Sequence, residues 1–132
     1  MQIRYFDNAA SSWPKPPQVA EAMKQCVDEY GANPGRGSHA MAVKASRILF
    51  ETRKNLSKLL HVKNPNDISF ALNTTAALNL AIQGFLKEGD HVICSNVEHN
   101  SVRRPLEYLR RTRNVAVSYA PSDLKGNINI KD

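Results

Sequence analysis

The second half of the chain alternates short apolar runs with segments of helical spacing, and this order strongly limits the possible folds. The apolar runs are "ISFAL" (68–72), "HVICS" (91–95) and "VAVSYA" (115–120). The segments between them, 73–86 and 102–113, place apolar residues three and four positions apart, as helices do. Apolar strands that alternate with helices indicate a parallel sheet covered on both faces. We therefore predict an α/β fold with a βαβαβ arrangement over residues 67–132.

The first half has a different pattern. Residues 1–16 read as an extended arm, because "WPKPP" (13–17) has three prolines in five positions and prevents a regular helix. A helical segment is predicted over residues 17–61, with apolar stripes that indicate one helix at 17–30 and another at 39–61.

The stretch between these two helices, "GANPGRGS" (31–38), has three glycines and one proline. It is predicted to be a loop with some residues at positive φ. Ser38 is expected to cap the second helix, because serine is a favoured residue at the start of helices.

The net charge of +6 comes largely from one predicted helix, 103–113. It contains Arg103, Arg104, Arg110, Arg111 and Arg113. A basic helix can bind nucleic acid or an acidic partner. No nucleic-acid motif accompanies these arginines, so we favour a solvated helix face with cations near its C-terminus and expect no nucleic-acid partner.

The length of 132 residues predicts a single domain. No apolar run approaches the roughly 20 residues of a membrane span, and the N-terminus lacks the pattern of a secretory signal. Cys26 and Cys94 form no CxxC pair, and we interpret them as two buried thiols without a disulfide. These features predict a cytoplasmic location and no membrane partner.

Two predicted strand-to-helix junctions could hold a ligand, because open parallel sheets bind ligands beyond the carboxyl ends of their strands. At the first junction, backbone N–H groups near residues 74–76 start a helix, where its dipole is positive. The hydroxyl groups of Thr74 and Thr75 add donors, which suits an anion. The alternative is simple helix capping by Asn73 or Thr74.

His99 lies at the second junction, after the strand predicted at 91–95. A histidine at this place could stack on a planar ligand, move protons or bind a metal. No second ligand lies at i+3 or i+4 and no CxxC or HxxxH pattern is present, so we expect no metal site. The alternative is a polar loop histidine with no role.

Taken together, the motifs resemble the N-terminal part of the cysteine desulfurases, within the class V aminotransferase family of pyridoxal-phosphate (PLP) enzymes. The matching segments, in order, are "YFDNAASSWPKP" (5–16), "GANPGRGSHAMA" (31–42), "RKNLSKLL" (53–60), "ISFALNTTAALNLAI" (68–82), "GDHVICSNVEHNSVRRP" (89–105) and "GNINI" (126–130). The resemblance covers essentially the whole chain. It implies the N-terminal part of a fold type I large domain, with a mainly parallel sheet after an arm and two helices.

The resemblance also implies roles for individual residues. The position matching Thr75, with the backbone N–H of Thr74, holds the cofactor phosphate in that family. The position matching His99 stacks on the pyridine ring and assists proton transfer. Four further residues are implied on the substrate side or at a dimer interface: Asn8, Ala9, Arg36 and His39.

The sequence departs from the family pattern at two positions of the phosphate site. The family usually has glutamate where Ala76 stands, and glycine or serine where Asn73 stands. Both changes keep the backbone donors, but they alter the side chains around the phosphate.

Several functional residues of the family have no counterpart in this chain. None of the nine lysines lies in the Ser-x-His-Lys type motif that provides the Schiff-base lysine. The aspartate beside the pyridine nitrogen, the nucleophilic cysteine and the arginine for the substrate carboxylate belong to later segments. Neither Cys26 nor Cys94 matches the nucleophile. We therefore expect an incomplete, inactive N-terminal fragment.

The resemblance implies that the parent enzyme converts L-cysteine to L-alanine and keeps the sulfur as a persulfide, for iron–sulfur cluster assembly or a related pathway. A homodimer and a sulfur-acceptor scaffold protein are implied as partners. One alternative is another class V enzyme, such as a selenocysteine lyase or an aminotransferase. A second is a short non-catalytic protein that binds a phosphorylated small ligand or pairs with a desulfurase subunit.

Overall fold

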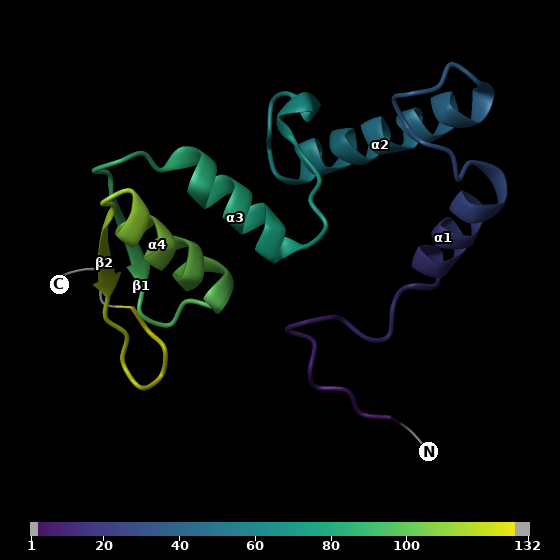
Figure 1. Ribbon diagram of the computed structural model, residues 1–132. Coiled ribbons are helices and arrows are strands. Elements are labelled where there is room, and N and C mark those ends of the chain that lie inside the picture. The colour runs from purple at the N-terminus through teal and green to yellow at the C-terminus, as the bar shows by residue number, and fades with distance from the viewer. Residues whose placement is uncertain (1–2, 129–132) are drawn as a thin grey trace. The chain divides into compact units, whose positions relative to one another are not determined.

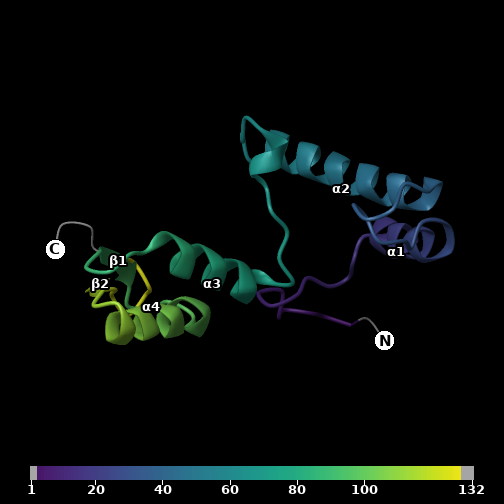
Figure 2. The same ribbon diagram turned by 45° about the horizontal axis from the view of Figure 1, so that its top comes forward.

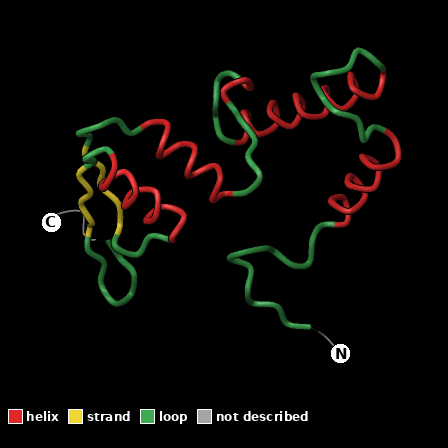
Figure 3. The backbone as a smooth tube through the Cα atoms, viewed as in Figure 1, coloured by secondary structure: helices red, strands yellow, loops and turns green. Residues whose placement is uncertain are grey.

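The computed structural model describes residues 3–128, and the chain divides into two compact units between Ser69 and Phe70. The single domain that the length predicts stays a prediction. Each unit has a small group of buried residues of its own. Figures 1 and 3 show the first unit as mainly helical, whereas the second combines helices and strands.

Residues 3–16 of the first unit form neither helix nor strand, but they are not extended throughout. A turn occupies residues 8–10, and the Oδ1 atom of Asn8 accepts a hydrogen bond from the backbone N–H of Trp13 at 3.0 Å. The ring of Trp13 lies edge-on to that of Tyr5, with 5.8 Å between centroids. The side chains of the predicted arm thus fold it back on itself.

Helix α1 (Pro17–Glu29) begins at a proline, which suits the first helical position because no intrahelical N–H bond is needed there. Helix α2 (Ala40–Leu59) begins after His39, and a short 3₁₀-helix, η1 (Pro65–Asp67), follows it. The cap predicted at Ser38 was wrong. His39 is the N-cap, since its backbone is extended and its Nδ1 atom accepts from the N–H of Ala42 at 3.4 Å.

The core of the first unit is small. Its buried apolar residues are Tyr30, Ala42 and Ala45. Lys44 joins α2 to the end of α1, because its Nζ atom lies 4.8 Å from the centre of the Tyr30 ring and 2.6 Å from Oε2 of Glu29. No residue of α1 is buried, so the predicted apolar stripe of this helix is largely uncovered.

The strand predicted at 68–72 is absent from the structure. The backbone is extended at Ile68 and at Asn73, as the apolar, β-favouring sequence indicates. A strand, however, also needs a neighbouring strand to receive its hydrogen bonds. Within residues 3–128 no strand pairs with this segment.

The second unit contains a parallel pair of strands, as predicted. Strands β1 (His91–Ser95) and β2 (Ala116–Ala120) pair in register, from His91 opposite Ala116 to Ser95 opposite Ala120. The imidazole of His91 also lies 2.8 Å from the hydroxyl of Ser118. The α/β class with parallel strands is therefore confirmed, with two strands among the described residues rather than three.

Helices α3 (Thr74–Phe85) and α4 (Asn100–Thr112) lie side by side in this unit, as Figures 1 and 2 show. The buried apolar side chains come from α4 and from the residue just before β2: Leu106, Leu109 and Val115. Arg113 joins the two helices, since its Nη1 atom donates to the carbonyl groups of Gln83 and Leu86 at the end of α3. This contact satisfies carbonyl groups that the helix itself leaves unpaired.

The turn predicted after β2 is present at residues 122–128. The carboxylate of Asp123 accepts from the backbone N–H groups of Lys125 and Asn127, and Gly126 adopts a positive φ of 83°. The last part of the "GNINI" motif lies outside the described residues. Among the described residues, no helix has the length and apolar character needed to cross a membrane.

Candidate functional site

The first predicted junction forms the start of helix α3. The side chain of Asn73 caps the helix, because its Oδ1 atom accepts from the N–H of Ala76 at 2.9 Å. The carbonyl of Asn73 then accepts from the N–H of Ala77, which is the first backbone bond of the helix. The N–H groups of Thr74 and Thr75 precede that bond and point out of the helix start. Asn73 therefore caps the helix, while the N–H groups of Thr74 and Thr75 remain free to bind an anion.

The second predicted junction forms the start of helix α4, and His99 is its N-cap. The Nδ1 atom of His99 accepts from the backbone N–H of Ser101 at 3.1 Å and lies 2.9 Å from the hydroxyl oxygen of the same serine. Because Nδ1 accepts, the ring proton of the neutral imidazole is on Nε2. Nε2 is thus the ring nitrogen left for a ligand.

The two helix starts contribute to one cavity of about 370 Å³. Its lining residues are Thr75, Asn79, His99, Asn100, Ser101, Arg104 and Pro105. The structure therefore brings Thr75 and His99 together, although 23 residues of sequence separate them. Thr74 lies one position earlier on α3 and does not line the cavity. The volume is within the range of small-molecule sites, about 300–1,000 Å³.

The charge around this cavity is positive. Arg104 is the one charged residue in its lining, and no acidic residue accompanies it. The N-terminal ends of α3 and α4 both add a partial positive charge. Glu98, the nearest acidic residue in sequence, accepts a hydrogen bond from the hydroxyl of Ser95 at 2.7 Å. The arrangement suits an anionic group beside a planar ligand.

Five lining residues were not predicted as site residues from the sequence, and they include Asn79, Ser101 and Arg104. Asn79 lies one turn after Thr75 and donates to its carbonyl at 2.9 Å, while Gln83 donates to Oδ1 of Asn79. Asn79 could have been identified from the sequence, because it lies four residues after Thr75 on a predicted helix and therefore on the same face. Ser101 lies two residues after the N-cap, a position that only the cap geometry identifies.

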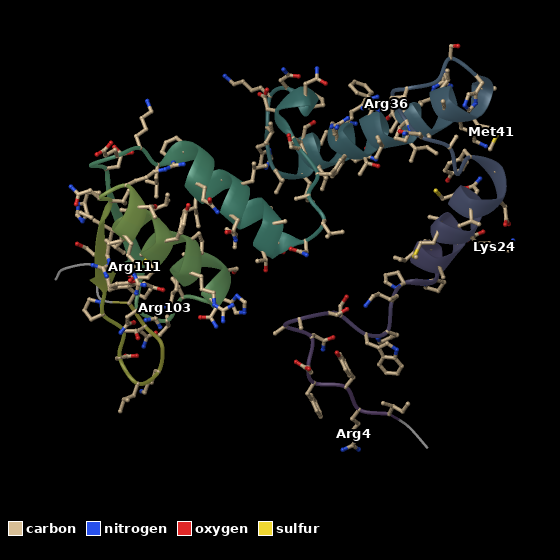
Figure 4. The ribbon with its side chains drawn as sticks, in the orientation of Figure 1. Arg4, Lys24, Arg36, Met41, Arg103 and Arg111 are labelled. Atoms are coloured by element: carbon tan, nitrogen blue, oxygen red, sulfur yellow. The ribbon has the colours of Figure 1, made fainter. Side chains whose placement is uncertain are left out.

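The other predicted site residues belong to the first unit. Asn8 and Ala9 lie in the turn at 8–10, and Arg36 lies in the glycine-rich loop, where Figure 4 labels it. A Cβ atom at Gly37 would be 2.9 Å from the ring of His39, so the loop packs closely on the cap of α2. The described contacts of these residues are local, and their roles remain predictions.

The cysteines differ from the two buried thiols that were predicted. Cys26 is exposed on α1, because the face of that helix is uncovered, while Cys94 is half-buried on β1. Burial raises the pKa of the Cys94 thiol, and the nearby Glu98 carboxylate raises it further. A raised pKa reduces the thiolate fraction that makes a cysteine nucleophilic. In residues 3–128, no three histidine, cysteine or acidic side chains form a group that could hold a metal.

The second unit thus combines a parallel strand pair with a cavity at two helix starts, an α/β arrangement that suits an anionic ligand. Residues 4–132 match the family model described as aminotransferase class-V. The chain belongs to this family, and the resemblance inferred from the motifs is confirmed.

Similar proteins include several desulfurases. A probable cysteine desulfurase of Methanothermobacter thermautotrophicus is 35% identical over 126 residues, which are 95% of this chain and 31% of that protein. A selenocysteine lyase of Bos taurus is 33% identical and aligns with 97% of this chain and 34% of its own length. The chain therefore spans about a third of the length of the relatives it matches.

Solved structures agree with the fold. The apo structure of a cysteine desulfurase from Thermococcus onnurineus NA1 has a TM-score of 0.85 and 30% identity, covering 96% of this chain and 32% of that one. A C-DES mutant with glycine covalently linked to its PLP cofactor has a TM-score of 0.67 at 20% identity, which shows a shared fold alone.

Proposed function

We propose that this chain provides the phosphate-binding helix start and one ring-contacting residue of a PLP-dependent cysteine desulfurase. The observation that supports this proposal most strongly is the shared cavity of Thr75 and His99. Membership of the class V family and the similarity to a cysteine desulfurase structure point to the same chemistry.

The residues present fit the cofactor. The free N–H groups of Thr74 and Thr75, at the positive end of α3, suit a phosphate dianion, and the hydroxyl of Thr75 adds a donor. Arg104 adds a positive charge to the same lining. When bound, PLP supplies an electron sink that stabilises negative charge on the substrate's α-carbon.

His99 has a separate role in this proposal. Its Nδ1 atom is held by Ser101, which fixes the position of the ring at the start of α4. With PLP bound, the imidazole ring would contact the cofactor, and Nε2 would exchange a proton with the substrate. Ser101 is a positioning residue, because it acts through the imidazole.

For the whole protein we propose conversion of L-cysteine to L-alanine, with the sulfur kept as an enzyme persulfide and passed to an acceptor protein. The similarity to a bovine selenocysteine lyase supports a second candidate, in which selenocysteine is the substrate. Comparing alanine release from the two amino acids by the whole protein separates these candidates. We also propose a homodimer and a cytoplasmic location.

The proposal is tested by measuring PLP binding directly. The ³¹P resonance of PLP is followed while the chain is added, which reports the phosphate and needs no activity. We expect the resonance to shift with the chain and to return when inorganic phosphate competes for the same donors. If the ³¹P resonance of PLP does not shift, or if added inorganic phosphate does not reverse the shift, the proposed phosphate site at Thr74 and Thr75 is contradicted.

A further inference from the structure

A second cavity, of about 560 Å³, lies between α4 and β2 in the second unit. Its main lining residues are Arg103, Arg104, Arg111, Tyr108, Tyr119 and Glu107. Figure 4 labels Arg103 and Arg111, which both come from α4 and lie near β2. We call this cavity the basic groove. It borders the candidate cofactor cavity at Arg104, which lines both.

The positive charges of the basic groove are only partly neutralised. The Glu107 carboxylate accepts from Arg110 at 2.7 and 2.9 Å and from Arg111 at 2.6 Å. Arg103 and Arg104 have no ion pair with any acidic residue in the part of the chain that the structure describes. Three arginines and one glutamate in the lining leave two net positive charges.

The place of the two unpaired arginines is unfavourable for the helix itself. Arg103 and Arg104 are the fourth and fifth residues of α4, next to the positive end of its dipole. The first turn has no acidic residue to offset them. Cations at this end do not stabilise the helix, so helix stability gives no reason for their presence. An anionic partner would offset this unfavourable charge.

The lining also indicates what kind of partner fits. Tyr108 is 55% exposed and Tyr119 is 43% exposed, and the Arg103 guanidinium lies 5.8 Å above the Tyr119 ring. Exposed tyrosine and arginine without lysine are typical of the residues that dominate protein interfaces. Glu107 lies in the lining and would repel a continuous phosphate backbone. These features favour a peptide with spaced carboxylates over a nucleic acid.

We propose that the basic groove binds an acidic segment of a partner protein. Two carboxylates of that segment pair with Arg103 and Arg104, and an apolar or aromatic side chain beside them packs on the exposed face of Tyr108. This site shares Arg104 with the candidate cofactor cavity, but peptide binding is measured without PLP, so its test is separate from that of the proposed function.

The test uses the full chain and a fluorescein-labelled peptide of alternating glutamate and serine, with binding followed by fluorescence anisotropy at low salt. A peptide with glutamine in place of glutamate is the control ligand. We expect saturable binding of the acidic peptide that weakens steeply with added salt, and no binding of the glutamine peptide. Failure of the acidic peptide to bind at about 1 mM, far above the range of specific protein pairs, overturns the proposal.

Two variants locate the binding. Arg103→Glu with Arg104→Glu should weaken it at least about tenfold, whereas Lys87→Glu with Lys125→Glu, which makes the same charge change outside the groove, should leave it within about twofold. Glu107→Gln should tighten binding, a gain that a poorly folded variant would not show. Equal effects of both double variants, or weaker binding by Glu107→Gln, contradict the assignment.

Competition identifies the class of ligand. A thymidine oligonucleotide that binds more tightly than the peptide would assign the groove to nucleic acid. Full displacement of the peptide by equimolar inorganic phosphate would assign it to a small anion. Either result overturns the proposed acidic protein segment.

Discussion

His99 has a structural role in the fold, and we propose a chemical role for it through different atoms. Its Nδ1 atom caps α4, and this role alone would explain a histidine at that position. His99 also lines the cavity that contains Thr75, and its Nε2 atom takes no part in the cap. The two roles can be separated by substitution, because asparagine is a good N-cap but has no aromatic ring.

We expect His99→Asn to retain the stability of the chain while reducing its affinity for PLP about fivefold, the effect of losing one aromatic contact. His99→Ala should reduce the affinity similarly and should also lower the free energy of unfolding by about 1 kcal/mol, because the cap is lost. Urea unfolding and ³¹P titration of both variants measure the two effects. Unchanged PLP affinity in His99→Asn would leave His99 with a capping role only.

At the scale of elements, the sequence predicted the helices, because their hydrogen bonds join residues that are close in sequence. The helical stripes predicted α1, α2, α3 and α4 to within two residues at each end, and one of the largest differences is at α4, which begins at Asn100 instead of residue 102. That difference arises because the His99 side chain caps the helix earlier than the apolar spacing indicates. His39 gives a similar result at α2. Histidine is a weak N-cap signal, so neither cap was predicted.

The element that was predicted wrongly depends on a distant partner. Residues 68–72 have the apolar pattern of a strand, but strand pairing is non-local and the described residues provide no partner. The same limit applies to the candidate site. Thr75 and His99 could be proposed from strand-to-helix junctions, whereas Arg104 could not, because its place in the cavity depends on how α3 and α4 pack together.

Glu107 gives a pH-dependent prediction for α4. Hydrogen bonds from Arg110, and then from Arg111, lower the pKa of Glu107 from 4.5 to about 2. A lowered pKa in the folded state stabilises the fold above about pH 4.5, and this contribution disappears as the pH falls through about 2. Glu107→Gln should therefore melt at a lower temperature than the natural chain at about pH 7 and at the same temperature at about pH 2.

Thermal unfolding followed by circular dichroism measures this difference at each pH. Added salt should reduce it, because the three side chains are exposed enough for screening. If the difference in melting temperature between the natural chain and Glu107→Gln is the same at neutral and at acid pH, the ion pairs of Glu107 do not stabilise α4.

At the scale of the whole molecule, the chain exposes more surface than compact units of its size. Its accessible surface is 11,120 Å², whereas two separate compact units of half its mass would expose about 8,400 Å² together. Large apolar side chains contribute to this excess, among them Val27, Leu72 and Phe85, which are 80%, 93% and 84% exposed. The relatives are about three times longer, and the uncovered faces are consistent with further contacts in proteins of that length.

We expect no desulfurase activity from this chain alone. In our proposal Thr75 and His99 contact the phosphate and one face of the cofactor ring, and the resemblance assigns none of the nine lysines to the aldehyde. Incubation of the chain with PLP and L-cysteine should give alanine and sulfide at the rate of PLP without protein. A faster release, abolished by heating the chain, would contradict this expectation.

One pair of variants tests most directly whether the N–H groups of Thr74 and Thr75, at the start of α3, bind the phosphate of PLP. Thr74→Pro removes one N–H donor at the first position of α3, where proline is tolerated and where Asn73 is already extended as a residue before proline must be. Thr74→Ala removes the hydroxyl and keeps the N–H.

The measurement is PLP affinity from the ³¹P titration. We predict that Thr74→Pro weakens binding about tenfold and Thr74→Ala less than about threefold, since hydrogen bonds to charged groups are the stronger ones. Equal affinities of the two variants would contradict a phosphate held at the start of α3.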